Sequence, residues 1–260
     1  MTSKKYPVEK ATKEKINKLF EYRRLTDLLK ASGLVNNQEF VNHLIDVQYQ
    51  IYMLDAYLES QWDIQKTQLK VYWEAISLSL QHMGFKKKQI ANFIREIKDY
   101  EKIERDCRKD SWPTKVSFRK FYATKSCDVR LIRHLIYLAH PDLKLKWKED
   151  SWIYYDIITE MNDDISDIVE DLKTYNGNRF LISILRKGGD KTHDQYAAYL
   201  SKISDKANRY FKNKRGEGQN KQLAGWTVSR SKETLKLLEV KVHSKIMDKV
   251  SQSLLLEHMK

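Results

Sequence analysis

Three oxygen-bearing side chains recur at every fourth position of one segment of this sequence, namely Asn162, Ser166 and Glu170. On an α-helix each fourth residue is rotated by only about 40°, so the three would lie in one stripe. An amide carbonyl, a hydroxyl and a carboxylate are hard oxygen donors, which suit a cation such as Mg²⁺. Because the three donors carry one formal negative charge, a cation held by them would keep affinity for an anion such as a diphosphate.

The neighbouring residues place this stripe beside a buried helix face. Asn and Ser are unfavourable in the middle of a helix, which favours a functional reason for their presence. Apolar residues flank the stripe at Ile157, Ile158, Met161, Ile165, Ile168, Val169 and Leu172. The alternative is a solvated acidic helix face, an interpretation that fits the adjacent Asp163, Asp164, Asp167 and Asp171.

The pattern Asn162-Asp163-x-x-Ser166-x-x-x-Glu170 resembles the second metal motif of class I terpene synthases, N-D-x-x-S-x-x-x-E, at every defined position. In that family the Asn, Ser and Glu bind a Mg²⁺ ion that holds the substrate diphosphate, so the resemblance implies the same roles here. The segment from Gly177 to Ile182 is similar to the Gly/Asn turn and apolar helix that follow the motif in the family. Val169 departs from the family, where many members have a basic residue, and Lys173 is the candidate substitute that would contact diphosphate.

The other metal motif of the family, an Asp-rich D-D-x-x-D/E, is absent from the sequence outside the segment 162–170. Its nearest counterpart is Asp55 and Glu59, which are one helical turn apart and would point the same way. Their D-x-x-x-E spacing resembles the reduced motif of squalene and phytoene synthases and of some divergent terpene synthases. The resemblance implies that both carboxylates bind metal and take part in catalysis; the alternative is an ordinary amphipathic helix with acidic residues outside.

Basic residues upstream of the metal motif occupy the position where the family keeps an arginine that senses diphosphate. Arg119 is the candidate by position, and Lys125 and Arg130 compete with it. Guanidinium groups suit this role because they make bidentate contacts with phosphate oxygens. The alternative is a basic helix with its arginines in solvent.

A second candidate for diphosphate binding lies near the C-terminus. Trp226 and Arg230 resemble a family element in which a Trp precedes a Ser/Thr-Arg-Tyr sequence, although Ser231 stands where Tyr is expected. The resemblance implies that Arg230 contacts diphosphate when the site closes. The alternative is a helix start with a buried Trp and a solvated Arg. The basic segment from Arg209 to Gly218 could be a lid over a phosphate site, a solvated loop or a patch that contacts RNA.

Helical spacing extends both proposed metal stripes toward a pocket that would hold a carbocation. On the helix of Asn162 the extension reaches Tyr155, Ile158 and Thr159, and on the helix of Asp55 it reaches Tyr52 and Gln48. Trp226 is a further candidate for the pocket wall. Aromatic faces can stabilise a cation through its attraction to the ring, although most aromatic residues serve as ordinary core.

Glycines and prolines divide the chain into segments with helical periodicity. We expect helices over about 9–31, 37–63, 65–82, 87–107, 115–138, 149–174, 192–212 and 223–257, with Asn36 or Asn37 capping the second and Asp190 or Thr192 the seventh. Only 8 Gly and 3 Pro occur in 260 residues, too few for a sheet with tight turns. The prediction is one all-α domain over residues 1–260, with an N-terminal helix at about 9–31 and a bundle at about 37–257 around a central cavity.

Composition limits the setting in which the protein works. Two cysteines give no disulfide framework and no zinc-type spacing, and no apolar stretch is long enough to cross a bilayer, so a cytoplasmic protein is expected. The net charge of +13 could attract nucleic acid, anionic membranes or phosphorylated metabolites, or could reflect a Lys-rich solvated surface. The oligomeric state is expected to be a monomer or a homodimer.

These features together predict a Mg²⁺-dependent class I terpene synthase, which the family resemblance implies would use three ions. Its substrate would be a linear prenyl diphosphate of fifteen or twenty carbon atoms, ionised to a carbocation that is cyclised or quenched. Neither nucleic-acid binding nor integral membrane association is expected. The alternatives are a prenyl transferase of the squalene/phytoene or trans-prenyl type, a non-catalytic basic protein that binds nucleic acid, and a degenerate synthase fold that binds without turnover.

Overall fold

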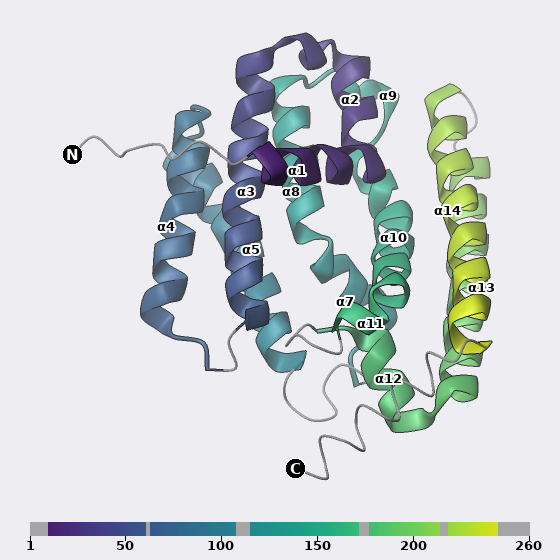
Figure 1. Cartoon of the computed structure of the whole chain (residues 1–260). Coiled ribbons are helices and arrows are strands. Elements are labelled where there is room, and N and C mark those ends of the chain that lie inside the picture. The colour runs from purple at the N-terminus through teal and green to yellow at the C-terminus, as the bar shows by residue number, and fades with distance from the viewer. Residues whose placement is uncertain (1–9, 61–62, 108–114, 172–176, 214–217, 244–260) are drawn as a thin grey trace. The chain divides into compact units, whose positions relative to one another are not determined.

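The computed structural model describes residues 10–60, 63–107, 115–171, 177–213 and 218–243, and every regular element within them is a helix (Figure 1). The chain is therefore all-α, as predicted. None of the helices in these ranges is long and apolar enough to span a membrane. Contacts between residues divide the chain into two compact units. The first unit consists of Met1–Asp99 and Cys127–Lys144, and the second of Tyr100–Ser126 and Leu145–Lys260.

The first unit is built on one long helix, α3, against which α1, α4 and α8 pack. Its buried side chains are aliphatic at helical spacing, for example Leu44, Val47 and Ile51 on α3. Its elements are α1 (Lys10–Tyr22), α2 (Leu25–Ser32), η1 (Leu34–Asn36), α3 (Gln38–Ser60), α4 (Lys66–His82), the larger part of α5 (Lys87–Cys107), α8 (Cys127–Ala139) and the start of α9 (Leu143–Lys146).

The second unit is organised around α10, which contacts α7, α12, α13 and α14. Its elements are the end of α5, α7 (Phe118–Lys125), the end of α9, η2 (Glu149–Trp152), α10 (Ile153–Ser166), α11 (Ile168–Asp171), α12 (Arg179–Lys187), α13 (Gly189–Asn213) and α14 (Gly218–His243). A helix surrounded in this way buries apolar residues on more than one face, which explains why Ile157, Ile158, Met161 and Ile165 are all buried.

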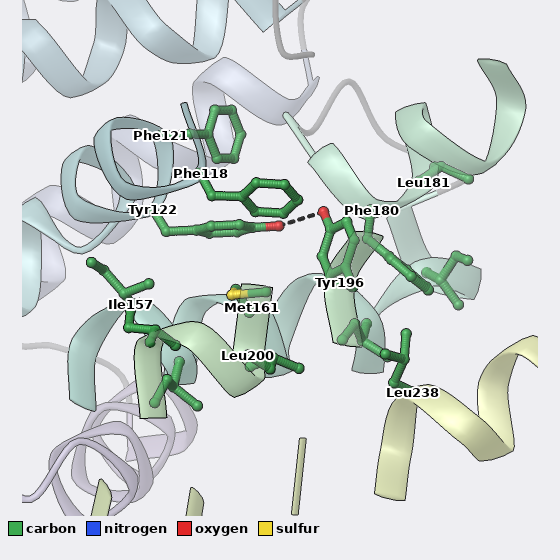
Figure 2. Packing of buried hydrophobic residues seen from close by; sticks show 14 of the residues in the cluster. Phe118, Phe121, Tyr122, Ile157, Met161, Phe180, Leu181, Tyr196, Leu200 and Leu238 are labelled. Carbon is green, nitrogen blue, oxygen red and sulfur yellow. Dashed lines mark hydrogen bonds between the residues drawn. The ribbon is translucent and has the colours of Figure 1, made fainter. Parts of the chain in front are cut away.

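Aromatic and aliphatic side chains from α10 and from the helices around it meet in one cluster (Figure 2). Phe118 and Tyr122 of α7 lie next to Phe180 of α12 and Tyr196 of α13. The ring of Tyr196 meets Phe118 and Phe180 edge-on, with 4.9 Å between ring centres in both pairs. Each fully buried side chain of this size contributes about 1.5–3 kcal/mol to folding, so this cluster fixes α7, α12 and α13 around α10.

Three predicted helices are interrupted where the sequence pattern continues. The first breaks at Arg24, which has a left-handed backbone conformation (φ 62°), so α1 and α2 are separate. The predicted helix over 115–138 is divided at Ser126, and the one over 149–174 ends its α-helical part at Ser166. Hydrophobic periodicity persists through each break, which is why the pattern did not reveal them.

Capping is confirmed at one of the two predicted positions. The Asn37 side chain accepts a hydrogen bond from the backbone N–H of Phe40 at 3.0 Å, at the start of α3. The helix expected to begin near Asp190 or Thr192 begins instead at Gly189, directly after Gly188, which ends α12 with φ 82°. A glycine is needed at position 188 because other residues are strained in that conformation.

Candidate functional site

The stripe predicted to hold metal begins in a buried position. Asn162 lies on α10 with 6% of its surface exposed, and its amide nitrogen donates a 3.0 Å hydrogen bond to the Thr234 hydroxyl on α14. Thr234 in turn donates to the backbone carbonyl of Arg230 at 2.8 Å. This contact orients the amide of Asn162, so that its carbonyl oxygen is the atom that would serve a cation.

The other two members of the stripe lie in exposed positions at the end of the same helical segment. Ser166 is the last residue of α10 and Glu170 belongs to the short α11. Between them Asp167 departs slightly from helical geometry (φ −93°, ψ 8°), yet its N–H still bonds to the carbonyl of Asp163 and the N–H of Asp171 bonds to the carbonyl of Asp167. The helical spacing of the stripe therefore persists across the break.

Acidic side chains crowd around this end of α10. Partial burial and the charges of Asp163 and Asp171 together raise the pKa of the Asp167 carboxyl to about 6, with a smaller effect from Glu170. Carboxylates that repel one another favour a bound cation, since the cation relieves the repulsion. The donor set at this end of the helix therefore fits Mg²⁺. Within the described residues, however, no group of three or more His, Cys, Asp or Glu side chains is arranged to hold a metal.

Helices α10 and α14 run side by side in the same direction, which brings together several residues of the predicted site (Figure 1). The direction follows from the pairs that connect them: Arg230 reaches Tyr155, Thr234 reaches Asn162, and the Lys241 ammonium donates to the carbonyl of Ser166 at 2.9 Å. One end of this pair of helices carries aromatic residues, and the other end carries the exposed members of the stripe.

The aromatic end contains three of the predicted residues. The Arg230 guanidinium donates a 3.4 Å hydrogen bond to the Tyr155 hydroxyl and pairs with Glu233 at 3.2 Å. Trp152 connects Tyr155 to Trp226, with ring centres 6.2 Å and 6.0 Å away. Arg230 is buried and held by these neighbours. Ile158 and Thr159 are also buried on α10, and the Thr159 hydroxyl bonds to the backbone carbonyl of Tyr155.

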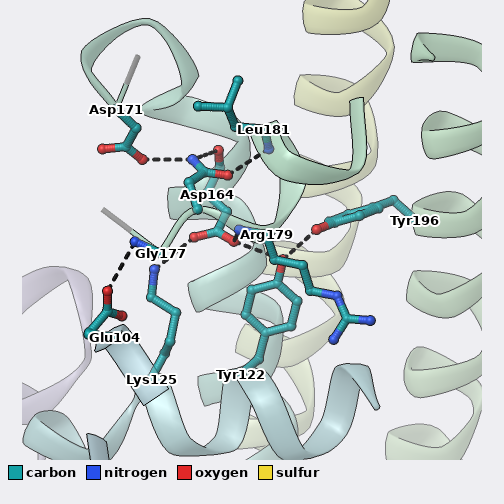
Figure 3. A network of polar contacts seen from close by, with 10 residues as sticks. Glu104, Tyr122, Lys125, Asp164, Asp171, Gly177, Arg179, Leu181 and Tyr196 are labelled. Atoms are coloured by element: carbon teal, nitrogen blue, oxygen red, sulfur yellow. Dashed lines mark hydrogen bonds and ion pairs between the residues drawn. The ribbon is translucent and has the colours of Figure 1, made fainter. Parts of the chain in front are cut away.

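Lys125, a predicted diphosphate ligand, takes part in a buried polar network (Figure 3). Its ammonium lies 3.0 Å from a carboxylate oxygen of Asp164 on α10. Burial alone lowers the pKa of Lys125, but the charges of Asp164, Glu104 and Glu160 outweigh it, and the pKa is raised well above its usual range. Lys125 is thus charged and engaged by acidic side chains of its own unit.

The remaining arginine candidates are separated by the break at Ser126. Arg119 is exposed on α7 of the second unit, whereas Arg130 is half-buried on α8 of the first unit. Lys173 lies outside the described residues. α7 contacts α10 through Asp164, which lies about 200° around α10 from Asn162. Arg119, which belongs to α7, is therefore on a different side of α10 from Asn162.

The residues predicted on α3 lie in the first unit. Asp55, Glu59 and Tyr52 are half-buried, and Gln48 is buried, where its amide donates to the Asp128 carboxylate at 3.1 Å. Asp55 and Glu59 share one helix with the spacing that the sequence predicts. Their assignment as metal ligands stays a prediction.

Two buried charged residues of the second unit were not predicted as site residues. Asp164 was considered only under the alternative of a solvated acidic face, but it is buried and accepts hydrogen bonds from the Tyr122 hydroxyl at 2.9 Å and from the Arg179 N–H at 3.0 Å. Arg179 belongs to the segment from Gly177 to Ile182 and was given no role of its own, yet it is 3% exposed with its guanidinium 4.1 Å from the centre of the Phe118 ring. Both depend on contacts with residues far away in the sequence.

Comparison with known proteins finds no relative of this chain. No family model matches the sequence, and neither the curated proteins nor the solved structures contain a match. The resemblance to class I terpene synthases therefore rests on the motif residues alone.

Proposed function

We propose that this protein is a Mg²⁺-dependent class I terpene synthase that ionises a linear prenyl diphosphate and cyclises or quenches the resulting carbocation. The observation that carries the proposal is the set of oxygen donors Asn162, Ser166 and Glu170, spaced one turn apart along α10 and α11. The crowding of carboxylates around Asp167 supports it, because a cation stabilises such a cluster.

Each residue of this site has a distinct role in the proposal. The carbonyl oxygen of Asn162, held in orientation by Thr234, the hydroxyl of Ser166 and the carboxylate of Glu170 hold the cation. Magnesium would supply positive charge that stabilises the departing diphosphate. Asp55 and Glu59, with their D-x-x-x-E spacing, are further candidate metal ligands.

The aromatic end of α10 and α14 would serve the other half of the reaction. In the proposal, Arg230 donates hydrogen bonds to diphosphate oxygens, and the aromatic side chains Tyr155, Trp152 and Trp226, which pack against one another, lie near the carbocation. A carbocation near these rings gains about 0.5–2 kcal/mol or more from each favourable ring contact. The rings therefore lower the energy of the intermediate without offering it a nucleophile.

The test is purified protein incubated with farnesyl or geranylgeranyl diphosphate and Mg²⁺. We expect release of inorganic diphosphate together with hydrocarbon or alcohol products, detected by gas chromatography with mass spectrometry, and no turnover in EDTA. Glu170→Ala should reduce turnover at least 100-fold by removing the only charged ligand of the stripe. Asp205→Ala, which changes an exposed carboxylate on α13, is the matched control and should retain wild-type turnover.

Three outcomes separate this proposal from its alternatives. Products longer than the substrate, formed when isopentenyl diphosphate is added, would identify a chain-elongating prenyl transferase. Binding of prenyl diphosphate without product would identify a non-catalytic protein. Undiminished turnover of Glu170→Ala would remove Glu170 from the site.

A further inference from the structure

Arg179 is a buried cation whose side chain has no hydrogen-bond acceptor among the residues that the structure describes. It is the first residue of α12 and is 3% exposed, and its Nε and Nη1 atoms make no hydrogen bond. Only its backbone N–H is paired, with a carboxylate oxygen of Asp164. Figure 3 shows the guanidinium directed away from that carboxylate.

The carboxylate of Asp164, which accepts from the Arg179 backbone, has hydrogen bonds from other donors as well. Asp164 accepts from the Lys125 ammonium, from the Tyr122 hydroxyl and from the backbone of Arg179. The Tyr122 hydroxyl is itself 2.6 Å from the Tyr196 hydroxyl. Asp164 therefore has its own cation in Lys125, and the Arg179 guanidinium is left without a hydrogen-bonded counter-ion.

Aromatic rings surround the guanidinium but do not replace an anion. Its central carbon lies 4.1 Å from the centre of the Phe118 ring and 5.5 Å from that of Phe121. Ring faces attract a cation, but they accept no strong hydrogen bond, and a buried unpaired charge carries a large desolvation cost. An arginine held in such a place keeps its five N–H donors available for a planar or tetrahedral oxyanion.

Tyr199 and Arg119 lie on the solvent side of the Phe118 ring that packs against Arg179. Tyr199 of α13 is half-buried and stacks on Phe118 with 4.6 Å between ring centres. Phe118 thus contacts both the Arg179 guanidinium and the Tyr199 ring. Burial raises the pKa of the Tyr199 hydroxyl, while the positive charges of Arg119 and Arg179 act to lower it. Arg119, the residue that follows Phe118, is exposed.

We propose that Arg179, Arg119 and Tyr199 form a binding site for a phosphate or diphosphate group that requires no metal. Arg179 forms the buried end and donates two hydrogen bonds to the anion. Tyr199 donates a third from its hydroxyl, and Arg119 holds the outer part of the anion at the surface. A diphosphate suits this arrangement better than a single phosphate, because it can contact both arginines.

This site is separate from the proposed metal stripe. Arg179 and α7 contact α10 through Asp164, whereas Asn162 contacts Thr234 on α14, about 200° around α10. The inference therefore does not depend on the proposed function, and metal-free binding and metal-dependent turnover can each fail without the other.

The test is isothermal titration of the full chain with inorganic phosphate, pyrophosphate and farnesyl diphosphate, all in EDTA. We expect pyrophosphate to bind more tightly than phosphate, and Arg179→Met and Arg119→Gln each to weaken pyrophosphate binding at least tenfold. Arg95→Gln, which changes an exposed arginine on α5, is the matched control and should bind as the wild type does. Farnesyl diphosphate binding more tightly than pyrophosphate would identify a lipid diphosphate as the ligand, and equal affinities would identify the free anion.

Thermal unfolding separates an anion site from a structural arginine. Without anion, Arg179→Met should unfold at the wild-type temperature or higher, because the substitution removes an unpaired buried charge, and pyrophosphate should raise the unfolding temperature of the wild type only. A wild type that fails to bind pyrophosphate in EDTA would overturn the proposal. Arg179→Met binding with wild-type affinity, or unfolding at a clearly lower temperature without anion, would do so too.

Discussion

At the scale of single residues, Asp164 is the point on which the polar contacts of the second unit converge. Its carboxylate connects α10 to Lys125 and Tyr122 of α7 and to the start of α12 (Figure 3). Burial and the charge of Asp164 raise the pKa of Tyr122 well above its usual range, so the phenol stays protonated and keeps donating. Tyr122 therefore donates to Asp164 as a neutral phenol, beside the charged Lys125.

Asp164→Asn should destabilise the protein strongly. The substitution leaves the Lys125 ammonium buried without its carboxylate, and breaking a buried pair in this way costs about 3–5 kcal/mol. The change is measured as the free energy of unfolding in urea. Asp163→Asn, at the neighbouring half-buried position, is the control and should differ little from the wild type. A small effect of Asp164→Asn would show that water screens Lys125.

The raised pKa of Asp167 predicts that the stability of the metal-free protein depends on pH. Its folded-state pKa of about 6 lies above that of an ordinary Asp near 4, so the folded state holds the proton over this interval while the unfolded state has lost it. The contribution of Asp167 to stability is therefore full below pH of about 4 and is lost as the pH rises through about 6. Asp167→Asn should remove this loss, and the variant should unfold at a higher temperature than the wild type at pH 7 in EDTA. Equal slopes of unfolding temperature against pH for the two proteins would contradict the assignment.

At the scale of elements, the junction between α10 and α12 depends on Asn178. Its side-chain oxygen caps α12 by accepting from the N–H of Leu181 at 2.8 Å. Its nitrogen donates to the backbone carbonyl of Asp164 at 2.7 Å and to the Asp171 carboxylate at 2.6 Å. One buried amide therefore fixes the start of α12, and with it Arg179, against the end of α10 and α11.

Asn178→Ala should cost about 2–4 kcal/mol of stability, since it removes a helix cap and leaves buried acceptors without their donor. Ser117→Ala is the matched comparison, because Ser117 caps α7 with a single hydrogen bond to the N–H of Lys120 in an exposed position. That variant should lose about 1 kcal/mol. Equal losses in urea unfolding would show that the two additional contacts of Asn178 contribute nothing.

At the scale of the whole molecule, the net charge of +13 gives the chain a general affinity for polyanions. Acidic residues are interspersed with the basic ones, and the basic side chains Lys125 and Arg230 are paired with Asp164 and Glu233. We therefore expect any attraction to polyanions to arise from the net charge rather than from these paired cations.

Binding to double-stranded DNA should therefore be weak, independent of sequence and sensitive to salt. Affinity measured by fluorescence anisotropy should fall at least tenfold between roughly 50 and 200 mM salt, because binding is driven by the release of counterions. Tight binding that persists at the higher salt, or a strong preference for one sequence, would favour the nucleic-acid alternative over the enzyme.

Much of the helical framework follows from the sequence because its signals are local. The scarcity of Gly and Pro and the helical periodicity between breakers predicted an all-α chain, and the start of α3 was predicted from the capping preference of Asn37. The stripe of Asn162, Ser166 and Glu170 was found by spacing alone, because every fourth residue of a helix keeps its direction whatever surrounds it.

Tertiary structure decided which of these faces are buried and what they contact. The sequence contains no sign that Asn162 is buried against Thr234 while Ser166 and Glu170 are exposed, because burial depends on which helix packs there. The same holds for Asp164 and Arg179: the pairing of Asp164 with Lys125 joins residues 39 positions apart. Only folding brings such residues together, and only folding leaves the guanidinium of Arg179 among aromatic rings with no acceptor in the described part of the chain.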